Sequence, residues 1–264
     1  MTFQSDTAVI PTDDGRYSSE IVDGWDVVGN ANGGYLLAIA ARAMSAAAGG
    51  ADPMVLNAHY LSPGRPGPIS ISPEVVKTGR RFTTVRARMA SPEKPMMELL
   101  GSFGDISALE GPQRIDAEPP ELPAPEDCER IEPAPSGFPP AMLGNIDLRL
   151  HPEDAGFYAG KPTGQPLFRG WFRLVNEEPI DPFGLLLAVD AFPPTIFNAN
   201  LPVGWCPTLE LTTHVRGIPE PGWLRCRFST RFISGGLLEE DGEIWDQTGR
   251  LVAQSRQLAL TPKA

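Results

Sequence analysis

Two segments of the chain are apolar on nearly every helical face. The first covers residues 33–48, follows the N-capping residue Asn32 and ends before Gly49 and Gly50. The second opens with Asp181 as N-cap and Pro182 as first helical residue, then reads FGLLLAVDAF up to the helix-breaking Pro193 and Pro194. A helix that is apolar all round is normally enclosed by protein, so the pattern predicts two buried helices.

Four strand-like segments follow each predicted helix. Their residues alternate between apolar and polar or are rich in β-branched types, and turn sequences such as PGRPGP and DQTGR separate them. Pro73 places the second of these segments at an edge or a bulge. Residues 16–28 and 168–175 are candidates for one additional edge strand in each half. The predicted strands are residues 55–61, 69–77, 82–90 and 96–103 in the first half, and residues 208–216, 223–232, 242–246 and 250–260 in the second.

The same order of predicted elements, one buried helix followed by a four-strand meander, therefore occurs in both halves of the chain. A curved antiparallel sheet wrapped around a central helix satisfies both patterns, because the helix covers the apolar face of the sheet. This layout predicts an α+β fold of the double hot-dog type, with units at residues 1–110 and 141–264. Between them, residues 111–140 are rich in proline and acidic residues and predict an extended linker.

Composition excludes several classes of protein. The 264 residues carry a formal net charge of −11, whereas nucleic-acid-binding proteins normally present a basic face. No apolar run reaches the roughly 20 residues that a membrane span needs, and the first residues lack the pattern of a secretory signal. Cys128, Cys206 and Cys226 are far apart and form no CxxC pair, which favours a reducing compartment. We expect a cytoplasmic protein.

Several well-known site motifs are absent from the sequence. There is no G-x-S-x-G, no G-x-G-x-x-G and no H-E-x-x-H, and the histidines His59, His151 and His214 do not have metal-ligand spacing. A serine nucleophile, a bound dinucleotide and a catalytic zinc are therefore disfavoured. We expect neither a metal nor another cofactor.

Asp190 is the most informative polar residue, because it lies inside the apolar segment LLLAVDAF. A carboxylate there must be paired, hydrogen-bonded or raised in pKa, unless it faces outward as the polar stripe of the helix. Thr208 begins a predicted strand and Gln257 lies in the last one, where each is individually an ordinary strand residue. Together, a carboxylate, a hydroxyl and an amide are able to activate and position one water molecule.

Three segments of the chain resemble the acyl-CoA thioesterase II family of double hot-dog enzymes. They are HYLSPGRPGPISISPEVVKTGRRFTTVRARMA (residues 59–90), TLELTTHVR (208–216) and DQTGRLVAQSRQ (246–257). The resemblance implies hydrolysis of acyl-CoA to free acid and CoA, with CoA entering only as part of the substrate. It also implies a catalytic set of Asp190, Thr208 and Gln257 in the second unit. Glu210 and Leu211 depart from the family, which often has Asp-His there.

The first unit offers no acidic residue between positions 33 and 48, so we expect it to shape the pocket without a catalytic carboxylate. Asn30 and Asn32 either bind ligand or serve as turn and N-cap residues. Arg80 and Arg81 either contact the phosphates of CoA or face solvent in a turn. Backbone N–H groups at a helix N-terminus would stabilise the oxyanion.

Three alternatives stay open at this point. One is a hot-dog enoyl-CoA hydratase or dehydratase, although those enzymes resemble one another by a His shortly after the Asp, and Asp190 is followed by Ala-Phe-Pro-Pro. Another is a non-catalytic acyl-CoA-binding protein, and a third is an unrelated β-rich binding domain. Exposed sheet edges favour a homo-oligomer.

Overall fold

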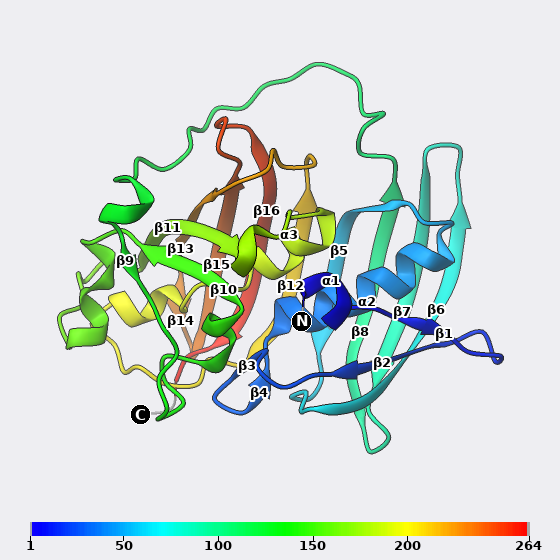
Figure 1. The fold of residues 1–264 in the computed structure, drawn as a ribbon, viewed down its shortest axis with the longest axis horizontal. Helices are drawn as coiled ribbons and strands as arrows, with labels where there is room; N and C mark the ends of the chain where they lie inside the picture. The colour runs from blue at the N-terminus through cyan, green and yellow to red at the C-terminus, as the bar shows by residue number, and fades with distance from the viewer. Residues whose placement is uncertain (1, 263–264) are drawn as a thin grey trace.

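A 14-stranded antiparallel sheet dominates the computed structural model, which describes residues 2–262 (Figure 1). The strands follow the order β1-β2-β6-β7-β8-β5-β12-β16-β15-β13-β11-β10-β9, and β14 pairs with β15 outside this path. The first-half strands are β1 (Ile10–Pro11), β2 (Tyr17–Ile21), β5 (Asp52–Tyr60), β6 (Gly67–Thr78), β7 (Phe82–Ala90) and β8 (Pro95–Gly104). The second-half strands are β9 (Glu129–Arg130), β10 (Ile146–Leu150), β11 (Leu167–Leu174), β12 (Thr208–Val215), β13 (Leu224–Ser229), β14 (Ile233–Ser234), β15 (Leu237–Trp245) and β16 (Leu251–Leu260).

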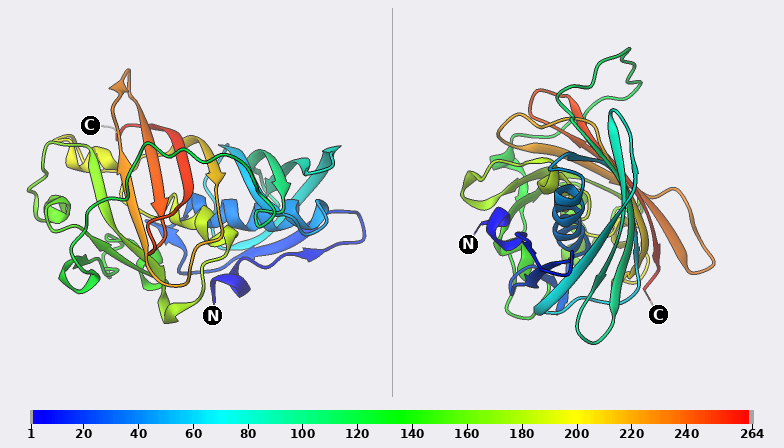
Figure 2. Two further views of the ribbon diagram at one scale, coloured as in Figure 1. Left: turned by 90° about the horizontal axis from the view of Figure 1, so that it is seen from above. Right: turned by 90° about the vertical axis from the view of Figure 1, so that its right-hand side faces the viewer.

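Both predicted helices are present on the concave side of the sheet, which confirms the double hot-dog arrangement (Figure 2). Helix α2 (Gly33–Ala47) has Asn32 as its N-cap, and α3 (Pro182–Ala188) has Asp181. A short helix, α1 (Phe3–Asp6), and a small β3 (Asp26–Val27) and β4 (Asn30–Ala31) hairpin lie beside α2. No helix among the described residues combines the length and apolar character needed to cross a membrane.

Helix α3 ends earlier than the sequence pattern predicts. Its last helical residue is Ala188, whereas the apolar segment continues to Phe192. The N–H of Asp190 donates to the carbonyl of Leu187 at 3.1 Å. This bond spans three residues, as in a 3-10 turn, instead of the four of an α-helix. Pro193 disfavours helical backbone at the residue before it, so the chain leaves the helix in advance of the proline pair.

The strand order differs from the predicted meander. Strand β5 pairs with β8 rather than with β6, and β12 pairs with β16, so the first strand of each set of four lies beside the last. β5 and β12 also pair with each other, with Ala58 opposite Leu211, which joins the two halves into one continuous sheet. Of the two proposed edge strands, β2 lies near one end of the sheet, but β11 is followed by the unpredicted β10 and β9.

The proline-rich segment arches over one end of the sheet before it reaches the second half (Figure 1). After the 3-10 helix η1 (Pro125–Asp127), β9 pairs with β10, and Cys128 and Ile131 are buried. The indole Nε1 of Trp171 also donates to the carbonyl of Pro123 at 2.9 Å. The later part of this segment thus packs on the second sheet, and the division of the chain at residues 110 and 140 stays a prediction.

The two halves are filled differently. Helix α2 has 15 residues and buries Tyr35, Leu37, Ile39 and Met44 against the first half of the sheet. Helix α3 has only 7 residues. Beyond it, three short 3-10 helices face the concave side of the second half, namely η2 (Ala141–Gly144), η3 (Asp154–Ala159) and η5 (Thr195–Asn198). Because α3 is short, room remains there for a cavity.

Candidate active site

A cavity of about 780 Å³ lies where the two halves meet. The first half contributes residues 30–33 and 60–64 to its lining, and the second half contributes Asp190, Thr208 and Gln257 among others. The structure therefore brings the three predicted site residues into one cavity. Its apolar part is lined by Phe138, Met142, Leu143, Leu148, Tyr158, Phe192, Phe197 and Phe228.

Asp190 lies just beyond the end of α3 and turns toward the N-terminus of α2. Its Oδ2 accepts hydrogen bonds from Gly34 N–H at 2.8 Å and from Asn32 Nδ2 at 3.0 Å. Burial raises the pKa of this carboxyl to about 6, although the hydrogen bonds from Gly34 and Asn32 act in the opposite direction. The residue is partly exposed, and it lines the cavity. The alternative of an outward-facing polar stripe is therefore wrong.

Asn32 connects the two helices through both ends of its amide. Its Oδ1 caps α2 by accepting from Tyr35 N–H at 2.9 Å, which confirms the N-cap prediction. Its Nδ2 donates to the carbonyl oxygen of Asp190 at 2.8 Å as well as to the carboxylate. A capping residue of the first unit thus fixes the candidate carboxylate of the second, a connection that sequence spacing does not reveal.

Two glycines allow α2 and α3 to approach each other. A Cβ atom at Gly34 would lie 2.6 Å from the Leu186 carbonyl oxygen and 3.0 Å from Asp190 Cβ. At Gly33 it would lie 2.9 Å from Asp190 Oδ2. Real Cβ atoms essentially never come within 3.0 Å of another heavy atom, so the helix contact needs glycine at position 34, and a side chain at position 33 would displace the Asp190 carboxylate.

Thr208 and Gln257 lie on the neighbouring strands β12 and β16. Thr208 pairs with Ala259 next to a bulge before Glu210, and Gln257 lies opposite Leu211. Gln257 is 8% exposed and faces the cavity. Among residues 2–262, neither side chain has a hydrogen-bond partner, which leaves the hydroxyl and the amide free to bind a ligand.

Two further cavity residues were not predicted from the sequence. The phenol of Tyr60 donates to the Gly33 carbonyl at 3.0 Å, and burial, reinforced by the charges of Asp190 and Glu210, raises its pKa well above the ordinary value. Glu240 lies on β15, where burial raises its pKa to about 7. Its sequence context, LLEEDGE, is that of a solvent-facing strand or turn and gives no signal of a buried carboxyl.

A thiol also lines the cavity, but its environment opposes nucleophilic catalysis. Burial raises the pKa of Cys206 to about 12, and the charge of Glu240 acts in the same direction. The thiolate, rather than the thiol, is the nucleophile, so Cys206 is inert at neutral pH. This agrees with the absence of an activated nucleophile in the sequence motifs.

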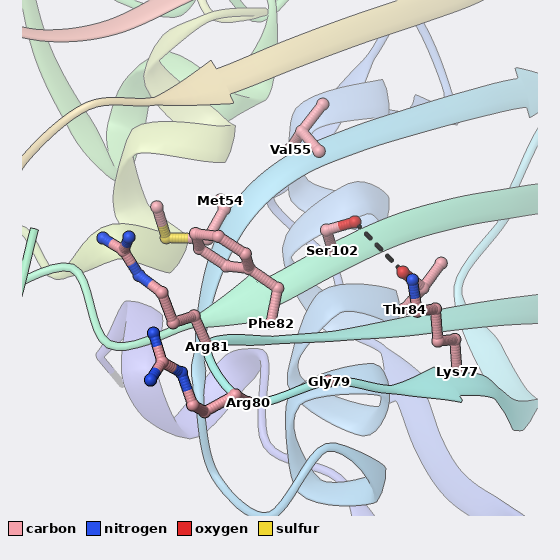
Figure 3. Close-up of a pocket in the computed structure, with 9 residues that line it drawn as sticks. All are labelled: Met54, Val55, Lys77, Gly79, Arg80, Arg81, Phe82, Thr84 and Ser102. Atoms are coloured by element: carbon pink, nitrogen blue, oxygen red, sulfur yellow. Dashed lines mark hydrogen bonds between the residues drawn. The ribbon is translucent and has the colours of Figure 1, made fainter.

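Arg80 and Arg81 lie away from this cavity. They line a shallow pocket on the first half of the sheet, together with Lys77, Phe82 and Thr84 (Figure 3). That pocket shares no lining residue with the large cavity. Contact of these arginines with the phosphates of CoA stays a prediction.

One group of side chains has the spacing of metal ligands. His151, Glu153 and Asp154 present ligand atoms within 4.8 Å of one another. However, Arg169 already binds both carboxylates, with Nη2 at 2.9 Å from Glu153 Oε2 and 3.0 Å from Asp154 Oδ1. The guanidinium fills the position that a cation would take, so we interpret the group as an ion-pair network.

Comparison with known proteins identifies similar chains. The family model of the acyl-CoA thioesterase C-terminal domain matches residues 125–261, and that of the N-terminal domain matches residues 21–104. A candidate thioesterase II from Thermobifida fusca is 32% identical, with a TM-score of 0.89 over 100% of this chain and 98% of that one. A hot-dog protein of unknown function from Alicyclobacillus acidocaldarius is 21% identical, with a TM-score of 0.86 over 99% and 98% of the two chains. An uncharacterized protein of Mycobacterium tuberculosis is 26% identical over 93% of this chain and 91% of that protein.

Proposed function

The chain belongs to the acyl-CoA thioesterase family, and we propose that it hydrolyses acyl-CoA with a water molecule that Asp190, Thr208 and Gln257 activate and position. The observation that carries this proposal is that these three side chains, from the residue just beyond α3 and from β12 and β16, line one cavity. The burial of Asp190 adds to it, because a carboxyl with a pKa of about 6 is a better base at neutral pH than an ordinary aspartate.

The reaction needs one proton transfer in each direction. Ionised Asp190 takes a proton from the water as its oxygen attacks the thioester carbonyl. The tetrahedral intermediate then collapses, the carbon–sulfur bond breaks, and the proton passes to the departing CoA sulfur. Thioester and water thus give a carboxylic acid and a thiol, with no covalent enzyme intermediate.

The N-terminal end of α2 is the candidate oxyanion site. Gly33 lines the cavity at the start of that helix, where the helix dipole favours negative charge. The N–H groups of Gly34 and Tyr35 already donate to Asp190 and Asn32, so the dipole rather than these donors would stabilise the transition state. The first unit would therefore contribute to catalysis without a carboxylate of its own.

The apolar part of the cavity would hold the acyl chain. The tilted rings of Phe192 and Phe228 have centroids 4.8 Å apart, and Phe157 packs against Phe168 and Phe197. A pocket with apolar walls and a few polar groups at one end is the usual form of a site for an amphipathic ligand.

Thiol release from short-, medium- and long-chain acyl-CoAs tests the proposal, with the wild type beside Asp190→Asn. We expect turnover by the wild type and a loss of kcat of at least about 100-fold in the variant, since a positioned base contributes roughly 10²–10⁴-fold. Thr208→Ala and Gln257→Ala should each reduce kcat less.

Asp13→Asn is the matched control, because Asp13 is exposed in the turn between β1 and β2 and does not line the cavity. Turnover that survives Asp190→Asn would contradict the assigned base but not the reaction. Binding of acyl-CoA without any thiol release would instead indicate a binding protein.

A further inference from the structure

Glu240 is the polar side chain directly beside Gln257 across the sheet. On β16, Gln257 has Leu211 of β12 on one side and Glu240 of β15 on the other. Directly opposed residues of antiparallel strands point to the same face, with Cβ atoms about 4.5–5.5 Å apart. Glu240 lines the same cavity as Gln257 and Asp190 and is 6% exposed.

A chain of hydrogen bonds fixes the Glu240 carboxyl. Its Oε2 accepts from the N–H of Thr195 at 2.7 Å, and the hydroxyl of Thr195 lies 2.6 Å from that of Thr230. The hydroxyl of Thr230 donates in turn to the carbonyl of Glu239 at 2.6 Å. One carboxyl oxygen is thus held, while Oε1 has no hydrogen-bond partner among the described residues.

Burial of this carboxyl costs the fold free energy. Burial raises its pKa, and the negative charges of Asp190 and Glu239 act in the same direction. No ion pair to Glu240 offsets this cost among residues 2–262. A neutral glutamine would also accept the hydrogen bond of the buried Thr195 N–H, without the cost of a buried charge, so stability alone gives no reason for a carboxyl here.

We propose that Glu240 is a positioning residue that orients the amide of Gln257 toward the reacting water. The inference rests on the proposed function. The two side chains are not hydrogen-bonded to each other among the described residues, but a carboxylate accepts hydrogen bonds. A rotation of the Gln257 amide would therefore bring its Nε2 to Glu240 Oε1 and turn its own Oε1 into the cavity. The water then donates one hydrogen to Asp190 and the other to Gln257 Oε1, and its lone pair is directed at the thioester carbonyl.

Two substitutions separate orientation from packing. Glu240→Gln is isosteric and keeps an oxygen for the Thr195 N–H, but it places donors beside Gln257. Glu240→Leu removes the hydrogen bond altogether. We expect both to reduce kcat about tenfold, the usual effect of one misdirected hydrogen bond, with KM changed less than about twofold.

A double-mutant cycle with Gln257→Ala shows whether Glu240 acts through Gln257. If it does, Glu240→Gln and Glu240→Leu cause no further loss of kcat in the Gln257→Ala protein. Glu239→Gln is the matched control, because Glu239 is the adjacent residue on the same strand but pairs with Leu258 rather than with Gln257. Its kcat should equal that of the wild type.

Equal losses in the two backgrounds would overturn the proposal, as would wild-type kcat in both Glu240 variants. If Glu240→Leu does not fold by circular dichroism, the cycle is completed with Glu240→Gln. A wild type that releases no thiol from any acyl-CoA would refute the proposed function itself, a result distinct from an active wild type whose Glu240 variants behave additively.

Discussion

Two opposing effects set the pKa of the Asp190 carboxyl close to the neutral range. Burial raises its pKa to about 6, while hydrogen bonds from Gly34 and Asn32 stabilise the ionised form. Since the proposed base works only when ionised, kcat/KM should rise as the pH increases toward about 6 and level off above it. Stopped or continuous thiol assays from about pH 4 to about pH 8 measure this profile.

The same profile should appear with acyl chains of different length, because the ionisation belongs to the free enzyme. An acidic limb centred near the ordinary aspartate pKa of 3.8 would contradict the buried environment of Asp190.

Asp190 should also destabilise the fold at neutral pH. Its pKa is higher in the folded protein than the ordinary 3.8, so the folded state binds the proton more tightly. Protonated Asp190 therefore contributes to the stability of the fold. This contribution is fully present below pH 3.8 and is lost as the pH rises through about 6. A shift of about two pKa units corresponds to about 3 kcal/mol.

Asp190→Asn removes this dependence, and we expect its Tm at about pH 8 to equal or exceed that of the wild type while activity is lost. Thermal denaturation of both proteins at about pH 4 and about pH 8 measures the difference between their pH dependences. A variant less stable than the wild type at the higher pH only would show that the ionised carboxylate stabilises the fold.

Sequence reasoning identified some cavity residues and missed others for a physical reason. Asp190 was identifiable because a carboxylate within an apolar helix is conspicuous. Glu240 was not, because it follows Glu239 in a strand whose first half the pattern did not predict, and only the register against Gln257 shows which of the two faces inward. In the sequence, Tyr60 looks like any aromatic residue of a strand, and only its hydrogen bond to the Gly33 carbonyl in the structure connects it with the site.

At the scale of elements, the contact of α2 with α3 depends on Gly34. A methyl group there would lie 2.6 Å from the Leu186 carbonyl, so Gly34→Ala should force the helices apart and lengthen the hydrogen bond to Asp190. We expect a loss of roughly 1–3 kcal/mol in stability, typical of overpacking, and a fall in kcat. Denaturant unfolding and thiol release measure the two effects.

Gly144→Ala is the control for this substitution, because an added Cβ there meets only Pro133 Cγ, at 3.9 Å. It should leave both stability and kcat close to the wild-type values. A Gly34→Ala protein with wild-type kcat would show that the catalytic geometry tolerates movement of α2.

The elements themselves were largely predictable, but their order in the sheet was not. Caps and apolar runs are local signals, so both helices and their N-caps Asn32 and Asp181 were identified. Pairing of β5 with β8 and with β12 is long-range and has no local signature. The short β10, IDLRL, does alternate between apolar and polar residues, but it covers only five residues, directly after the proline-rich segment, and it was not predicted.

For the molecule as a whole, the two halves make different and complementary contributions to the candidate site. The long α2 fills its half of the sheet and presents its N-terminus to the junction, whereas the short α3 leaves the cavity open and places Asp190 at that N-terminus. Neither half holds the candidate site alone, because Asn32 and Gly34 of the first unit bind the carboxylate of the second.

Asn32→Asp tests this dependence of one half on the other. Aspartate caps a helix as well as asparagine, so α2 should persist. The variant loses the Nδ2 donor to Asp190 and places a second carboxylate beside it, and a like charge raises the pKa of its neighbour. The acidic limb of the kcat/KM profile should therefore move upward from about pH 6 by at least one pH unit, roughly as in other carboxyl pairs.

Asn30→Asp adds the same charge to the cavity lining but has no hydrogen bond to Asp190 among the described residues, so its profile should shift less. If the two variants shift equally, general cavity charge rather than the Asn32–Asp190 contact controls the base. If neither shifts, the ionisation that limits the rate belongs to another group, and Glu240, with its pKa of about 7, is the next carboxyl in the cavity to examine.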